Sequence, residues 1–117
     1  MTLNLYNPEH GDQPLRRIRI SEIIEVVSRV TNLTEAQITG PCRMRDFVDA
    51  RTIVANLGHT QAGRSSAMIG RSLGNRDHTT VLNYLHRHPR RMGGSQDYET
   101  IYNDVSNLVH RKRLEWA

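Results

Sequence analysis

Four consecutive polar residues, Asp77-His78-Thr79-Thr80, offer the densest hydrogen-bonding chemistry in the sequence. An aspartate at such a place can cap the backbone amides of a helix or accept a hydrogen bond from a cytosine amino group. The imidazole of His78 can donate to a purine or a phosphate, and the threonine hydroxyls and methyls suit bases, phosphates and thymine methyl groups. Capping alone accounts for the aspartate, so Asp77 by itself favours neither interpretation.

The elements that position this run are two predicted helices, residues 65–73 and 77–88, joined by the turn Gly74-Asn75-Arg76. This spacing is typical of a helix-turn-helix, whose second helix enters the DNA major groove with its N-terminal end first. The free amides and the positive dipole at that end also favour contact with phosphate. Helical hairpins without any role in DNA binding share the spacing. The distribution of charge therefore has to distinguish a DNA-binding helix-turn-helix from such a hairpin.

The 117 residues contain 16 basic and 12 acidic side chains, and the formal net charge is +4. Residues 43–91 hold nine arginines and three aspartates, a net charge of +6, while residues 1–42 and 92–117 each sum to −1. A concentrated positive segment predicts a polyanionic partner, most commonly nucleic acid. Fifteen of the basic residues are arginines, a composition that phosphate binding favours and that a GC-rich genome also produces.

The sequence also excludes several classes of function. No glycine-rich stretch contains a lysine, so there is no GxxxxGK[ST] loop for nucleotide hydrolysis. One cysteine, Cys42, excludes an internal disulfide and a cysteine-based zinc site, and the spacing of His78, His86 and His88 does not suit helical metal ligands. The sequence contains no nucleophile–base pair that would indicate an enzyme. Without a membrane span or a leader, we expect a cytoplasmic, nucleoid-associated protein with no cofactor.

The apolar pattern predicts an all-α fold, because no segment alternates with a period of two. We expect residues 1–19 to form a flexible N-terminal arm and residues 20–117 to form one domain. Pro89 is expected to end the fifth helix and leave residues 90–95 as a loop before the last helix. The predicted helix caps near the start of the domain are Ser21, Thr34 and Asp46.

The hexamer Arg76-Asp77-His78-Thr79-Thr80-Val81, preceded by Ile69-Gly70, closely resembles the signature of the C-terminal DNA-binding domain (domain IV) of the bacterial replication initiator DnaA. The resemblance covers roughly residues 20–109 and includes an Ile-Ser-x-Ile-Ile-x-x-Val opening and an Arg43-x-Arg45 loop. It implies a helical, Trp-repressor-like domain that binds a nine-base-pair, non-palindromic DnaA box as a monomer.

The resemblance also implies roles for individual residues. The run from Asp77 to Thr80 would read the major groove, and Arg43 would enter the adjacent minor groove, a place that suits a loop arginine. Arg45 and Arg51 would contact phosphates. The other positions implied to face DNA are His59, Ser65, Ser66 and Arg76. The sequence departs from the family pattern at His59, Ser66, Ala67 and Leu73-Gly74-Asn75.

Together these features predict sequence-specific binding of double-stranded DNA at DnaA-box-like sites. The full initiator carries an AAA+ ATPase ahead of this domain, so we expect a replication or transcription regulator that works without ATPase activity. The alternative is a protein–protein interaction module that keeps the fold, has lost base readout and binds the initiator or its partners. The substitutions at His59, Ser66 and Ala67 leave room for it.

Overall fold

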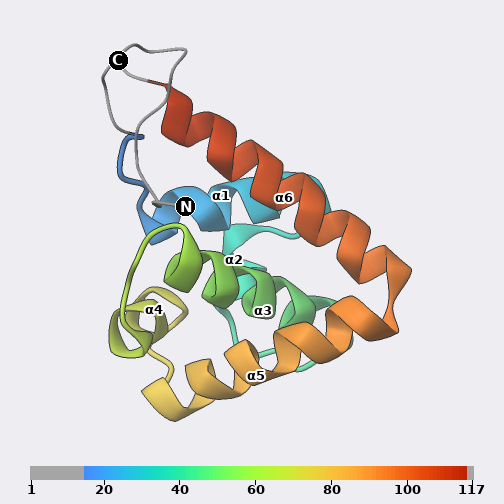
Figure 1. Cartoon of the computed structure of the whole chain (residues 1–117). Helices are drawn as coiled ribbons and strands as arrows, with labels where there is room; N and C mark the ends of the chain where they lie inside the picture. The colour runs from blue at the N-terminus through green and yellow to red at the C-terminus, as the bar shows by residue number, and fades with distance from the viewer. Residues whose placement is uncertain (1–14, 116–117) are drawn as a thin grey trace.

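The computed structural model describes residues 15–115, and in that range it contains six helices and no strand. The helices are α1 (Ile20–Thr31), α2 (Glu35–Thr39), α3 (Arg45–Thr60), α4 (Ser66–Ser72), α5 (His78–Gly94) and α6 (Gln96–Leu114). Figure 1 shows α3 in the middle of the molecule, with α1 and α6 above it and α5 below it. The predicted all-α fold is confirmed. None of the described helices has the length and apolar composition needed to cross a bilayer.

The core is built around α3, whose middle is buried on every side. All residues from Ala50 to Ala55 are buried. Each fully buried aliphatic side chain stabilises a fold by about 1.5–3 kcal/mol, so the contacts around α3 hold the other helices in place. The buried side chains that meet it include Ile23 and Val27 of α1, Ile38 of α2, Ile69 of α4, Val81 of α5 and Val105 of α6.

One of the three predicted helix caps is confirmed, and two are shifted. Thr34 caps α2, with its hydroxyl accepting from the Gln37 amide at 3.0 Å and the Gln37 side chain accepting from the Thr34 amide at 2.8 Å. Ser21 lies inside α1, because the Glu22 carboxylate accepts from the amide of Arg19 and the helix begins earlier. Asp46 lies in the first turn of α3, where its negative charge interacts favourably with the helix dipole.

The prediction that Pro89 ends the fifth helix is wrong, because α5 continues through residues 90–94. Asp49 of α3 accepts hydrogen bonds from Arg87 at 2.6 Å and from two nitrogens of Arg91, each at 3.0 Å. These ion pairs lie on both sides of the proline and hold α5 against α3. An internal proline removes one helical hydrogen bond and costs about 3 kcal/mol, and these ion pairs contribute in the opposite direction.

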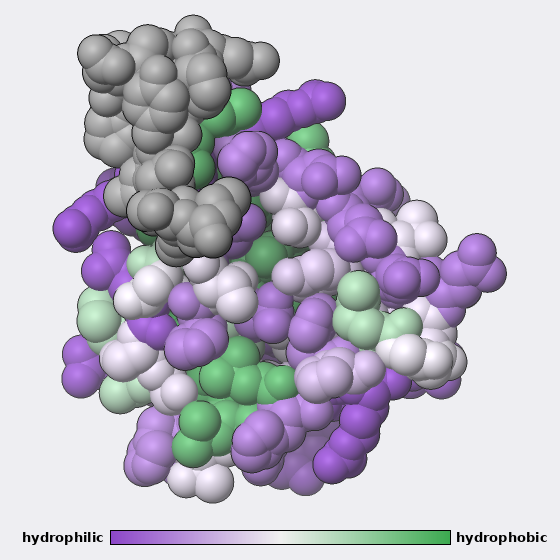
Figure 2. Space-filling view, in the orientation of Figure 1, coloured by the Kyte–Doolittle hydropathy of each residue, from purple (hydrophilic) through white to green (hydrophobic). Residues whose placement is uncertain are grey.

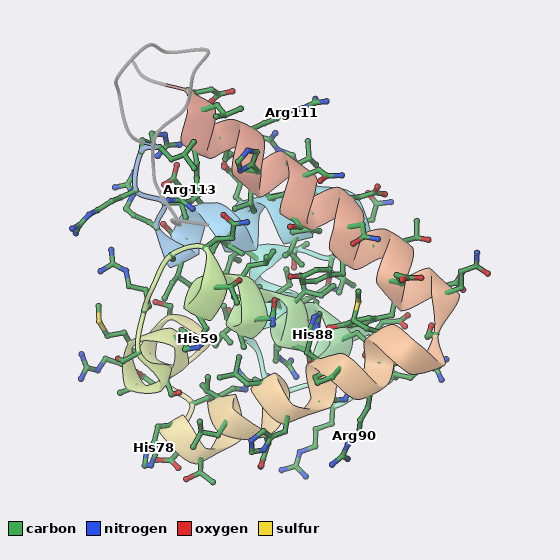
Figure 3. The ribbon with its side chains drawn as sticks, in the orientation of Figure 1. His59, His78, His88, Arg90, Arg111 and Arg113 are labelled. Carbon is green, nitrogen blue, oxygen red and sulfur yellow. The ribbon has the colours of Figure 1, made fainter. Side chains whose placement is uncertain are left out.

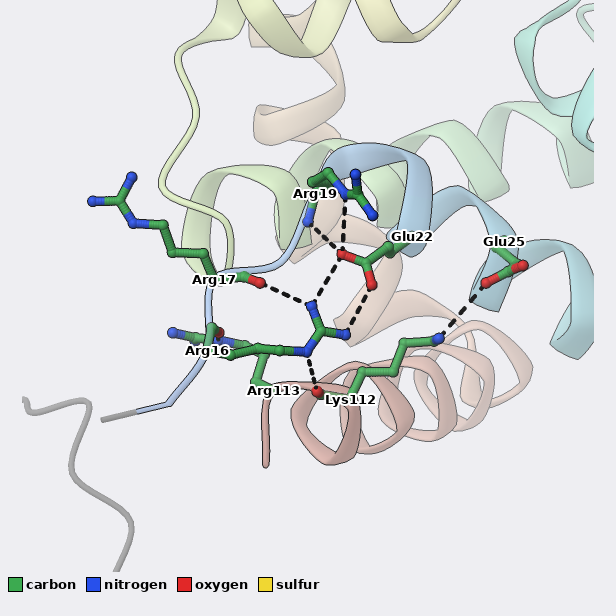
Figure 4. A network of polar contacts seen from close by, with 7 residues as sticks. All are labelled: Arg16, Arg17, Arg19, Glu22, Glu25, Lys112 and Arg113. Carbon is green, nitrogen blue, oxygen red and sulfur yellow. Dashed lines mark hydrogen bonds and ion pairs between the residues drawn. The ribbon is translucent and has the colours of Figure 1, made fainter. Parts of the chain in front are cut away.

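Part of the segment that the sequence assigns to an N-terminal arm is folded against the domain. Residues 1–14 lie outside the described residues, but residues 15–19 belong to the folded domain. Ile18 is 1% exposed. Arg16 pairs with Glu22 at 2.8 Å, and its guanidinium and amide also donate to carbonyl oxygens at the end of α6 (Figure 4). The sequence pattern did not indicate this packing of residues 15–19, because two partners of Arg16 come from the far end of the chain.

The Arg16–Glu22 pair predicts a specific pH dependence of stability. Hydrogen bonding to Arg16 lowers the pKa of Glu22 to about 2, from 4.5 in the unfolded chain. The stabilisation is therefore complete above pH 4.5 and is lost as the pH falls through 2. Glu22→Gln should lower the free energy of unfolding at pH 7 by roughly 1–2 kcal/mol, and the difference should shrink below pH 4.

Thermal unfolding of both proteins between pH 2 and pH 7 measures this effect. Glu25→Gln is the matched control, since the Glu25 carboxylate is half-exposed and lies 3.6 Å from the Lys112 ammonium. It should change stability by less than about 0.5 kcal/mol. A loss at Glu22 that stays constant down to pH 2 would contradict the ion-pair explanation.

Candidate nucleic-acid interface

Helix α4 and the turn that leads into α5 approach each other closely at Gly70. A Cβ atom on Gly70 would lie 2.1 Å from the carbonyl oxygen of Arg76, so only glycine fits there. The Arg76 amide donates to the Gly70 carbonyl at 2.8 Å. Gly74 and Asn75 have φ angles of 74° and 59°, the left-handed conformation that these residue types tolerate best. This turn fixes the N-terminal end of α5 relative to α4, and the predicted helix-turn-helix is confirmed.

The first turn of α5 exposes the polar residues that the sequence singled out. Asp77 caps the helix, with its Oδ2 accepting from the Thr79 amide at 3.1 Å. That bond lowers the pKa of the Asp77 carboxyl, so it is charged at neutral pH. The side chains of Asp77 and His78 are 67% and 62% exposed. Thr79 is exposed and Thr80 half-buried. Capping uses one carboxylate oxygen, the other lies 3.4 Å from Nδ1 of His78, and both side chains remain accessible to a ligand.

Two further basic side chains are exposed beside this turn: Arg43 in the loop before α3, and Arg45, the first residue of α3. Met44 lies between them and is 65% exposed. Arg43, Arg76 and Thr80 line one open hollow of about 620 Å³ between this loop and α5. The structure therefore brings the loop arginine and the first turn of α5 to the same hollow.

Arg51, which the sequence predicts to contact phosphate, is held by the fold itself. Arg51 is 1% exposed, because it lies in the buried middle of α3. Its Nε donates to the Ile38 carbonyl at 2.7 Å and its Nη2 to the Gly40 carbonyl at 2.6 Å. Burial lowers the pKa of the guanidinium, and these carbonyl oxygens compensate the desolvated charge. Arg51 thus binds the end of α2.

Arg76 also turns its guanidinium toward the protein. Its Nη1 donates to the carbonyl oxygens of Thr39 at 3.0 Å and Leu73 at 2.6 Å. Its Nη2 donates to the Gly40 carbonyl at 2.5 Å, the same oxygen that accepts from Arg51. The two arginines therefore join the turn before α5, the middle of α3 and the loop that follows Gly40.

Comparison with known proteins identifies the source of this geometry. A family sequence model described as the bacterial DnaA protein helix-turn-helix matches residues 20–87, more than half of the chain. The chain belongs to this family. The chromosomal replication initiator protein DnaA of Rhodopseudomonas palustris (strain BisB18) is 33% identical over 103 residues, 88% of this chain and 21% of that protein. DnaA of Ruegeria sp. (strain TM1040) is 38% identical over 102 residues, 86% of this chain and 20% of that protein. The chain spans about a fifth of the length of these relatives.

The remaining positions of the DnaA pattern lie at the ends of α3 and α4. His59 is exposed near the end of α3, and His78 lies at the start of α5 (Figure 3). The Ser65 hydroxyl caps α4 by accepting from the Met68 amide at 3.2 Å. Ser66, in the first turn of α4, is half-buried. His59 and His78 are thus accessible, whereas Ser65 also has a structural role in its helix.

Other arginines of the basic segment divide into paired and exposed side chains. Arg87 and Arg91 are held by Asp49, so their charges are used within the fold. Arg71 and Arg90 are exposed, and Figure 3 shows Arg90 far along α5 from its DnaA-type first turn. Hydrophilic side chains cover most of the face seen in Figure 2. The accessible positive charge near the first turn of α5 therefore comes from fewer arginines than the sequence count indicates.

Proposed function

We propose that this DnaA-family domain binds double-stranded DNA sequence-specifically at DnaA-box-like sites. The first turn of α5 enters the major groove, Arg43 enters the adjacent minor groove and Arg45 contacts phosphate. One observation carries the proposal: the exposed Asp77 and His78 stand at the free N-terminal end of the second helix of a helix-turn-helix. Arg43 borders the same hollow as Thr80 of that turn. The relatives are named as chromosomal replication initiators, which supports this target.

The proposed role is regulation of replication or transcription by occupancy of these sites, without ATP hydrolysis. The sequence contains no GxxxxGK[ST] loop, in keeping with a role that depends on binding alone. A non-palindromic site presents one target to one recognition helix, so we propose binding as a monomer. Nucleoid association follows from DNA binding.

The second candidate is a protein-interaction module, and one observation favours it. Arg51 and Arg76, two of the positions that the DnaA pattern places at DNA, donate to backbone carbonyls. Such a module would bind the initiator or its partners and would not discriminate between DNA sequences. Sequence-selective DNA binding therefore separates the two candidates.

Single substitutions in the two proposed readout elements test the DNA proposal. Arg43→Ala and His78→Ala should each weaken binding to the box by about 1–3 kcal/mol and affect random DNA less, because base contacts confer specificity. Competition binding with box and scrambled duplexes at one salt concentration measures both affinities. Arg90→Ala is the control, since it removes an exposed arginine away from the site. Equal losses on both duplexes with Arg43→Ala would contradict minor-groove readout.

A further inference from the structure

We propose that Arg51 and Arg76, the arginine pair, set the distance between the Arg43 loop and the first turn of α5. This inference deepens the proposed function and rests on it. The two arginines act as positioning residues, and the side chains they position contact the DNA. The pair thereby makes the register between minor-groove and major-groove readout a fixed property of the fold.

The helix-turn-helix packs closely against the end of α2. A Cβ atom on Gly74 would lie 2.2 Å from the carbonyl oxygen of Thr39. The backbone of the turn therefore touches the backbone at the end of α2, with no side chain between them. Only two residues, Pro41 and Cys42, separate Gly40 at this contact from Arg43.

Two guanidinium groups bind carbonyl oxygens at this contact. Arg76 donates to the carbonyl oxygens of Thr39 and Gly40, and Arg51 donates to those of Ile38 and Gly40. Three successive carbonyl groups are thus held from two elements, α3 and the turn before α5. The two cations repel each other, and this repulsion adds to burial in lowering the pKa of Arg51. The arrangement persists because each cation is neutralised by several carbonyl dipoles.

Arginine and lysine differ in how many carbonyl oxygens they can bind at such a site. A planar guanidinium presents five donors in a fixed geometry, so Arg76 can bind Thr39, Leu73 and Gly40 at once. A lysine keeps the charge, but its single ammonium cannot bridge the same three oxygens. A phosphate contact, in contrast, tolerates lysine as a point charge. Arg76→Lys therefore separates positioning from phosphate binding.

The consequence for DNA is a fixed offset between the two readouts. One base pair moves a contact by about 3.4 Å along the DNA axis and rotates it by roughly a tenth of a turn. A rigid loop cannot follow such a displacement. The wild-type domain should therefore discriminate strongly against a box with one base pair inserted between the two readout positions, and a domain with a loosened loop should do so weakly.

The test compares Arg76→Lys and Arg76→Gln with Arg90→Lys, whose exposed position gives the matched control. In the free protein, ¹⁵N heteronuclear NOE values at Cys42, Arg43 and Met44 should fall in both Arg76 variants. On DNA, both should lose at least about tenfold of the discrimination between the box and the inserted box, and Arg76→Lys should keep the wild-type salt dependence. Wild-type behaviour of Arg76→Lys beside a loss in Arg76→Gln would overturn the proposal and indicate a phosphate contact.

A second measurement uses the wild-type protein and therefore tests the proposal even if the variants fail to fold. The side-chain ¹⁵Nη signals of Arg76 should be resolved without DNA and unchanged by box DNA, because the carbonyls already hold them. Signals that sharpen or shift only with DNA would overturn positioning. If the wild-type domain does not distinguish a box from scrambled DNA, the proposed function fails. The NOE and Nη data in the free protein still decide whether the arginine pair holds the loop.

Discussion

Gly70→Ala should destabilise the domain by at least about 3 kcal/mol, a large share of the 5–15 kcal/mol that holds a small domain together. The added methyl would lie 2.1 Å from the carbonyl oxygen of Arg76, which is backbone and cannot rotate away. Relief requires α4 and α5 to separate, which breaks the hydrogen bond from the Arg76 amide to the Gly70 carbonyl. The substitution should therefore also displace the first turn of α5 and abolish sequence-selective DNA binding.

Chemical denaturation with circular dichroism measures the loss, and a second helical glycine provides the control. Nothing lies within 4 Å of a Cβ atom built on Gly93 in α5. Gly93→Ala should stabilise the domain by about 0.5–1 kcal/mol, because alanine favours the helix and nothing has to move. If Gly70→Ala also stays within 1 kcal/mol of the wild type, the close approach of the two helices is contradicted.

Arg51→Ala should cost roughly 2–4 kcal/mol of stability, the second largest effect that we expect. Arg51 is buried, and its loss leaves the carbonyl oxygens of Ile38 and Gly40 without these partners and opens space beside α3. A role in phosphate binding would instead leave stability unchanged, weaken all DNA sequences alike and reduce the salt slope by about one unit. Denaturation curves and salt titrations of the same variant separate the two roles.

Arg71→Ala is the matched control for Arg51→Ala, since Arg71 is an exposed arginine on α4. It should change the free energy of unfolding by less than about 0.5 kcal/mol. Arg51→Lys should recover little of the lost stability, because one ammonium cannot reach both carbonyl groups. A variant at Arg51 with wild-type stability and a flattened salt dependence would refute its structural role.

Local features of the fold could be predicted from the sequence because their causes are local. Thr34 lies three residues before Gln37, and Asp77 caps the helix that its own neighbours form. The glycine and asparagine of the turn adopt left-handed conformations that few other residues accept. The helix-turn-helix and its exposed first turn follow from such short-range rules.

The features that could not be predicted depend on partners distant in the sequence. Arg87 and Arg91, on either side of Pro89 in α5, bind Asp49 of α3, a partner that the local sequence around the proline does not indicate. The inward direction of Arg76 depends on the carbonyl groups of Thr39 and Gly40, and the burial of Arg51 on helices that surround α3 on all sides. A charge count along the chain cannot distinguish an arginine that is exposed to solvent from one that is hydrogen-bonded to backbone carbonyl groups.

We propose above all that the first turn of α5, together with Arg43, reads a DnaA-box-like sequence. Fluorescence anisotropy with a labelled DnaA-box duplex and a scrambled duplex, each titrated at several salt concentrations, tests it most directly. We expect binding to the box to be tighter by a factor on the order of a thousand, with the ratio persisting as salt rises. Equal affinity for both duplexes, or no binding at low salt, would contradict it.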